Sequence, residues 1–96
     1  KRRFSPVATE VIEPVIVVYS SAFCPYCRRA RALLDSKGSR YTVLDVDREP
    51  RLWDEIARRT GRSTVPQIFI GDRHVGGCDD LFALDRRGEL DALLKG

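Results

Sequence analysis

The fold of this chain is decided by residues 15–27, VIVVYSSAFCPYC. The stretch opens with a continuous, mostly β-branched run, which is typical of a short strand buried on both faces. From Pro25 onward the apolar side chains recur with helical spacing. Cys24 and Cys27 therefore stand between a strand and the first turn of a helix. A C-x-x-C pair in a β-α-β setting indicates a thiol–disulfide redox site.

Strands and helices alternate along the whole chain. We expect a strand over 15–19, a helix over 25–37, a strand over 41–46, a helix over 50–60, strands over 67–70 and 73–75, and a last helix from Asp79 or Asp80. The first two strands should be parallel, and the last two, joined by a tight turn, antiparallel. This β-α-β-α-β-β-α order predicts an α/β fold in which helices flank a four-stranded mixed sheet.

Three local expectations go with this order. The second strand should be central or partly covered. Gly88 should break or kink the last helix. The second helix should carry an apolar stripe of Leu52, Trp53, Ile56 and Ala57.

Composition narrows the classes of protein to which the chain can belong. Its 96 residues suit one domain, and three cysteines, an odd number, do not suit a disulfide-stapled scaffold. No apolar run approaches the roughly 20 residues that a membrane span needs. The net charge of +3 is modest, with acidic and basic residues interspersed. We therefore expect neither a membrane protein nor a nucleic-acid-binding one.

Residues 1–14 show no sustained periodicity. We expect them to be a flexible tail or linker ahead of one domain over 15–96. Because the chain begins with Lys1 instead of methionine, we expect a trimmed end. The expected location is the cytoplasm, or an organelle if an upstream targeting segment has been removed.

The cysteine pair has a physical basis for redox chemistry. Cys24 is expected at the N-cap of its helix and Pro25 at the first helical position, where unpaired N–H groups favour a thiolate. Cys27 lies on the same helix face, within reach of a disulfide, and should be the more buried, resolving thiol. Two alternatives are a structural cysteine pair and a zinc site of Cys24, Cys27, His74 and Cys78.

Two further segments suit ligand binding. In 64–66 (TVP) the proline favours an extended Val65, whose N–H and C=O could pair with a peptide alongside. In 76–80 (GGCDD) two glycines allow close approach, the helix N-terminus suits a carboxylate, and Asp79 would pair with an ammonium. Together these groups fit a free α-amino-acid moiety. An edge proline and an Asp-capped glycine turn are the alternatives for each segment alone.

The three segments together resemble the glutaredoxins. CPYC at 24–27, TVP at 64–66 and GGCDD at 76–80 are similar to the two-cysteine members, closest to the small bacterial ones. The resemblance runs from about residue 15 to residue 94. It implies a thioredoxin-like fold and a glutathione-dependent oxidoreductase that reduces protein disulfides and glutathione mixed disulfides. It further implies glutathione as co-substrate, no metal, a monomer, and disulfide-containing or glutathionylated proteins as partners.

The resemblance also implies roles for individual residues. Cys24 would be the nucleophile and Cys27 the resolving thiol. The glutathione contacts would be Tyr26, Thr64, Val65, a cis Pro66, Gly77, Cys78 and Asp79.

The chain departs from the family pattern at two positions. Ser21 stands where a lysine is common, and Trp53 where a polar or basic contact is common. The charge that meets the glycine carboxylate of glutathione is therefore expected from Arg28, Arg51 or Arg62. A thioredoxin-type reductase and a zinc or interaction module are the alternative functions.

Other features have simpler interpretations. The arginines at 28, 29 and 31 and at 58, 59 and 62 should lie on solvated helix faces, because no aromatic residues interleave with them. His74 should be exposed without a catalytic role, and Trp53 should serve packing. Cys78 should be an exposed third thiol, whose backbone matters more than its sulfur.

Overall fold

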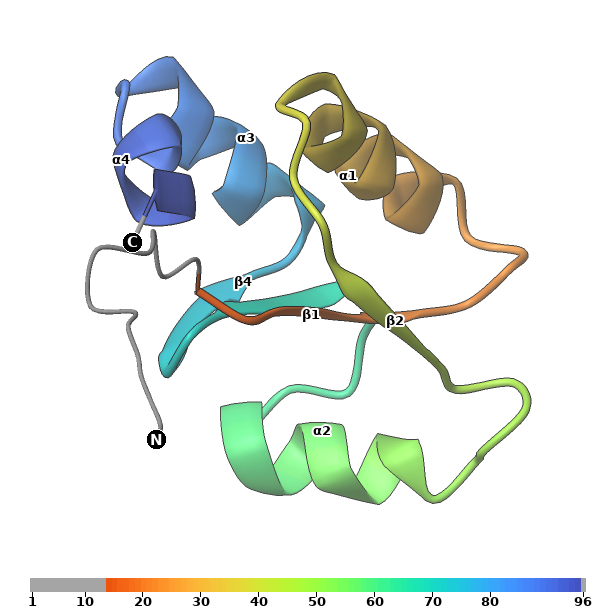
Figure 1. The fold of residues 1–96 in the computed structure, drawn as a ribbon. Helices are drawn as coiled ribbons and strands as arrows, with labels where there is room; N and C mark the ends of the chain where they lie inside the picture. Colours follow the sequence, from red (N-terminus) through yellow and green to blue (C-terminus); the bar gives the residue numbers. More distant parts are fainter. Residues whose placement is uncertain (1–13, 96) are drawn as a thin grey trace, which may run out of the picture.

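The computed structural model describes residues 14–95, along which strands and helices follow the expected order (Figure 1). The elements are β1 (Ile16–Ser20), α1 (Pro25–Ser36), β2 (Thr42–Asp45), α2 (Leu52–Thr60), β3 (Gln67–Ile70), β4 (Arg73–Gly76), α3 (Cys78–Arg86) and α4 (Leu90–Lys95). Each predicted element is present. The one difference in element order is that the predicted last helix is two helices, α3 and α4.

The sheet has the strand order β2-β1-β3-β4. β1 pairs in parallel with β2 and antiparallel with β3, and β3 pairs antiparallel with β4, so the predicted directions are confirmed. Of the two placements expected for the second strand, the central one is wrong. β2 is an edge strand, with Thr42 and Val43 exposed and Leu44 and Asp45 partly buried.

Helices cover both faces of the sheet, with α1, α3 and α4 on one face and α2 on the other (Figure 1). Successive side chains of a strand point to opposite faces. Val18 of β1 therefore enters the larger core with α1 and α3, and Tyr19 enters the smaller core with α2. Both side chains are fully buried, which explains the continuous apolar run at the start of 15–27. The buried strand β1 holds the loop before α1 in place.

The buried stripe of α2 is narrower than expected. Leu52 and Ile56 are buried, whereas Trp53 is 36% exposed and Ala57 is exposed. A helix turns by about 100° per residue, so positions 53 and 57 lie beside the stripe of 52 and 56. Since α2 has only nine residues and rests on one face of the sheet, it buries that single stripe. Only two of the four residues of the apolar stripe are therefore buried, and Trp53 and Ala57 lie outside the buried part.

Gly88 breaks the last helix, as one of the two expected outcomes. Its φ of 75° lies in the left-handed region, where glycine carries no Cβ penalty. The N–H of Glu89 then donates to the carbonyl of Leu84 at 3.0 Å. The turn starts α4 in a new direction and buries Leu90 against the larger core.

Residues 1–13 of the predicted tail lie outside the described residues, so the tail and the domain boundary stay predictions. Within residues 14–95, no helix is both long enough and apolar enough to span a bilayer.

Candidate active site

Cys24 lies where β1 gives way to α1, at the N-cap predicted for it. Its backbone is extended (φ −102°, ψ 115°), and its Sγ accepts a hydrogen bond from the N–H of Cys27 at 3.3 Å. That N–H belongs to the first turn of the helix, where donors have no intrahelical partner and stabilise negative charge. The preceding loop is braced by Ser21, whose hydroxyl donates to Asp47 at 2.7 Å and whose carbonyl accepts from the Cys24 N–H at 3.3 Å.

Cys27 differs from Cys24 in its access to solvent. Cys27 is fully buried, whereas Cys24 is partly exposed, and both are free thiols. Burial raises the pKa of the Cys27 thiol, although the nearby Ser21 backbone and Ser20 hydroxyl work in the opposite direction. Of the two thiols, Cys24 is therefore the one open to solvent, and burial favours the neutral form of Cys27.

The segment 64–66 lies beside Cys24. The Cys24 thiol points to the carbonyl oxygen of Val65, at an Sγ–O distance of 3.8 Å. The Val65–Pro66 bond is cis, as the resemblance implied. Sequence positions 41 residues apart thus meet at one point, where an extended chain could lie along Val65 while its disulfide faces Cys24.

The turn at 76–80 is closed by a carboxylate that sequence reasoning treated only as a candidate cap. Asp80 accepts the N–H of Gly77 at 2.9 Å and pairs with the Arg62 guanidinium at 3.0 Å. The Gly77 N–H, followed by Arg62, lowers the pKa of Asp80, so the group remains a carboxylate at neutral pH. Asp79, the residue expected to meet an ammonium, stays free of this bond system and lines the adjacent pocket.

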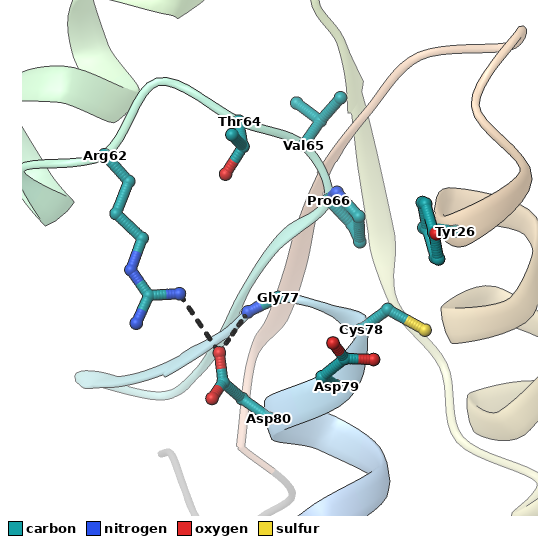
Figure 2. A pocket seen from close by; sticks show the side chains of 9 residues that line it. All are labelled: Tyr26, Arg62, Thr64, Val65, Pro66, Gly77, Cys78, Asp79 and Asp80. Carbon is teal, nitrogen blue, oxygen red and sulfur yellow. Dashed lines mark hydrogen bonds and ion pairs between the residues drawn. The ribbon is translucent and has the colours of Figure 1, made fainter.

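These segments enclose a pocket of about 220 Å³. Figure 2 shows it between the 64–66 loop, the start of α3 and the ring of Tyr26. All seven predicted glutathione contacts line it, together with two more residues. The lining residues are Tyr26, Arg62, Thr64, Val65, Pro66, Gly77, Cys78, Asp79 and Asp80.

The three arginines that could meet the glycine carboxylate, Arg28, Arg51 and Arg62, lie in different places. Arg62 lines the pocket, at the end opposite to Tyr26 (Figure 2). Arg51 pairs with Glu49 at 2.9 Å, and Arg28 is exposed on α1; both lie outside the lining set of the described residues. Of these three arginines, Arg62 is the one that lines the pocket.

Two expectations about exposed side chains are wrong. Cys78 is only 4% exposed, because its side chain packs into the core shared by α1 and α3, and burial raises the pKa of its thiol. His74 is partly buried and hydrogen-bonded to Gln67.

The alternative zinc site of Cys24, Cys27, His74 and Cys78 finds no support among the described residues. Among the residues that the structure describes, no group of three or more His, Cys, Asp or Glu side chains could hold a metal ion. The imidazole Nε2 of His74 is 2.7 Å from Gln67 Oε1.

Gln67 is a site-region residue that sequence reasoning missed. It was assigned only to a strand, but its amide donates to the Thr64 carbonyl at 3.1 Å and to the Thr64 hydroxyl at 3.2 Å. The signal available in the sequence was a polar amide inside the apolar run of 67–70.

Comparison with known proteins agrees with this geometry. The family model described as Glutaredoxin matches residues 16–75. A glutaredoxin of Pseudomonas aeruginosa is 56% identical over 81 residues, which cover 84% of this chain and 96% of the relative. Glutaredoxin 3 of Escherichia coli K12 is 54% identical over 80 residues, covering 83% and 96%.

Solved structures of glutaredoxins are also similar to this chain. A crystal structure of a buckwheat glutaredoxin–glutathione complex superposes with a TM-score of 0.80 at 37% identity, covering 84% of this chain and 76% of that one. The solution structure of a Brucella melitensis glutaredoxin reaches a TM-score of 0.77 at 51% identity, covering 86% and 90%.

Proposed function

Because this chain belongs to the glutaredoxin family, and is therefore a glutathione-dependent thiol–disulfide oxidoreductase, we propose that Cys24 is its nucleophile and Cys27 its resolving thiol. The observation that carries the assignment is the position of the Cys24 sulfur. It is partly exposed, it accepts a helix N-terminal N–H, and it lies beside Val65 next to a pocket. Cys27 is buried directly behind it.

Two substrate classes follow two routes. With a protein disulfide, the Cys24 thiolate attacks one sulfur and displaces the other as a thiolate, which takes up a proton. Cys27 then loses its proton and attacks Cys24, releasing the reduced protein and leaving a Cys24–Cys27 disulfide. Two glutathione molecules reduce this disulfide and leave as glutathione disulfide.

The glutathionylated substrates need only one enzyme thiol. Cys24 attacks the glutathione sulfur of the mixed disulfide, and the protein thiol leaves. A second glutathione then attacks the sulfur of glutathione bound to Cys24, which releases glutathione disulfide and restores the Cys24 thiolate. Each cycle oxidises one free glutathione thiol and reduces one protein sulfur, while the glutathione sulfur of the mixed disulfide stays in a disulfide throughout, so the electrons balance.

The pocket is the proposed glutathione site. The buckwheat relative was crystallised as a glutathione complex, which supports the same ligand here. We assign Val65 to the backbone of the glutathione cysteine, Thr64, Pro66 and Tyr26 to the groove walls, and Gly77, Cys78 and Asp79 to the γ-glutamyl end. Arg62 takes the glycine carboxylate, since a guanidinium has five donors and Asp80 occupies only part of them.

The proposed partners are disulfide-containing or glutathionylated proteins, on which the chain acts as a monomer. The cytoplasmic location stays a prediction from the sequence.

Turnover with two reducing systems tests this function. With glutathione, glutathione reductase and NADPH, reduction of a small glutathione mixed disulfide should oxidise NADPH in proportion to the protein added. With thioredoxin reductase and no glutathione, turnover should be absent. Turnover by thioredoxin reductase alone would indicate the thioredoxin-type alternative, and inactivity in both systems with one bound zinc per chain would indicate the metal module.

Replacing Arg62 with alanine tests the carboxylate contact. Losing a charge-assisted hydrogen bond worth about 1.5–3 kcal/mol should raise KM for the glutathione mixed disulfide roughly tenfold or more, with a smaller change in kcat. Arg51→Ala is the matched control, because its guanidinium pairs with Glu49 outside the pocket. Equal KM values for the two variants, measured by steady-state kinetics, would reject the role of Arg62.

A further inference from the structure

Gln67 is a polar side chain in a fully buried position. It is 0% exposed at the start of β3, and the three residues that follow it, Ile68, Phe69 and Ile70, are apolar and buried. Burying an amide is unfavourable unless its donors and acceptor are paired. Gln67 meets this condition, because its Nε2 donates to Thr64 twice and its Oε1 contacts His74.

The partners of Gln67 determine the direction of these bonds. The Thr64 carbonyl can only accept, so the amide nitrogen of Gln67 must face Thr64. Its oxygen then faces His74, and this 2.7 Å contact requires the His74 proton on Nε2. A chain of donors thus runs from His74 to Gln67 to Thr64. Since imidazolium also carries a proton on Nε2, the chain persists whether the ring is neutral or charged.

The sheet register brings the two side chains together. His74 is the cross-strand partner of Phe69, after a register shift between Ile68 and Phe69. Gln67 and Phe69 point to the same face of β3, so Gln67 is the diagonal neighbour of His74. The imidazole also packs on the Phe69 ring, with centroids 5.0 Å apart. The ring that donates to Gln67 is therefore held from two sides.

The donor chain ends on the loop that faces the nucleophile. Thr64 precedes Val65, whose carbonyl oxygen is 3.8 Å from Cys24 Sγ. Gln67 and His74 are outside the set of described residues that lines the pocket. They act on the loop through the hydrogen bonds of Gln67 to the carbonyl and the hydroxyl of Thr64.

We propose that Gln67 and His74 form a positioning pair. The pair fixes the position of the 64–66 loop relative to Cys24, and so sets the affinity for a glutathione mixed disulfide. The proposal rests on the function proposed above, in which Val65 carries the backbone of glutathione. Without the pair, Thr64 loses two hydrogen bonds, and Val65 samples positions that do not match the substrate.

The test compares His74→Phe with His74→Gln. Phenylalanine keeps a ring against Phe69 but has no donor for Gln67, whereas a glutamine amide nitrogen can take the place of Nε2. We expect His74→Phe to raise KM for a glutathione mixed disulfide about fivefold, the effect of about one hydrogen bond, with a smaller change in kcat. His74→Gln should return KM toward the wild-type value. Gln67→Leu, which removes the middle of the chain and its hydrogen bonds to both Thr64 and His74, should raise KM further.

The control variant is Ile68→Val, which trims a side chain that packs in the core on the opposite face of the same strand. All variants are measured well below their melting temperatures. If His74→Phe and Gln67→Leu change KM no more than Ile68→Val does, or if His74→Gln fails to restore it, the positioning pair is rejected. Failure of the proposed function itself looks different, because the wild-type protein would then not turn over the glutathione mixed disulfide.

Discussion

Cys24→Ser should lose glutathione-dependent reduction of a small glutathione mixed disulfide by about 10³-fold or more, the scale on which enzymes suffer from loss of a covalent nucleophile. The thiolate is the attacking species in disulfide exchange, and a serine hydroxyl does not form at neutral pH an anion that could replace it. The N–H of Cys27 would still reach the position of the missing sulfur. The local backbone geometry would be kept, and the attack on the disulfide would be lost.

Cys27→Ser is the matched variant, because it removes the neighbouring sulfur from the same helix turn. It should keep a large part of the activity on the small mixed disulfide, where a second glutathione completes the cycle. It should lose reduction of a protein disulfide, which needs an intramolecular attack on Cys24. NADPH-coupled rates on both substrates measure the two effects. Activity retained in Cys24→Ser, or equal losses on both substrates in Cys27→Ser, would contradict the assigned roles.

The parts of the fold that were predicted from sequence are those fixed by neighbours along the chain. The run at 15–19, the Pro25 start of α1 and the N-cap position of Cys24 depend on a few consecutive residues. The left-handed glycine at 88 likewise acts on the residues beside it. Local signals of this kind are visible in periodicity and capping residues.

The parts that were missed depend on contacts between distant segments. Nothing within 41–46 reveals that β2 has no strand on its outer side. Cys78 is buried in a core that α1, α3, α4 and the sheet build together. The bond between Gln67 and His74 exists only in the register that a shift between two residues of β3 creates. Arg62 was one of three candidates until the turn at Asp80 placed it at the pocket.

Gly76→Ala should have the second large effect, because it adds a Cβ where the turn leaves no room. Gly76 has a φ of 118°, which L residues rarely adopt. The added Cβ would also lie 2.7 Å from Cγ and 3.0 Å from Cβ of Asp80, and closer still to its Oδ2. Since two of these atoms are near the Asp80 backbone, rotation of the carboxylate alone does not relieve the overlap.

The expected loss of stability has two sources. Backbone strain at such a position costs about 1–3 kcal/mol, and displacing Asp80 removes a helix-capping bond worth about 1 kcal/mol. We expect the free energy of unfolding to fall by about 3 kcal/mol in denaturant titrations. Gly38→Ala is the matched control: φ is 71°, and within residues 14–95 no atom beyond its chain neighbours lies within 4 Å of the added Cβ, so only the strain remains.

A pH series separates loss of the Asp80 bonds from strain alone. In the wild-type protein the Gly77 N–H and Arg62 lower the pKa of Asp80. The stability that these bonds contribute is present above the ordinary Asp value of about 3.9 and is lost as pH falls below it toward the folded pKa. Gly76→Ala should lack this part of the acid-dependent decline, whereas Gly38→Ala should retain it. If both variants lose equal stability and keep the same acid dependence, Asp80 does not depend on the glycine at 76.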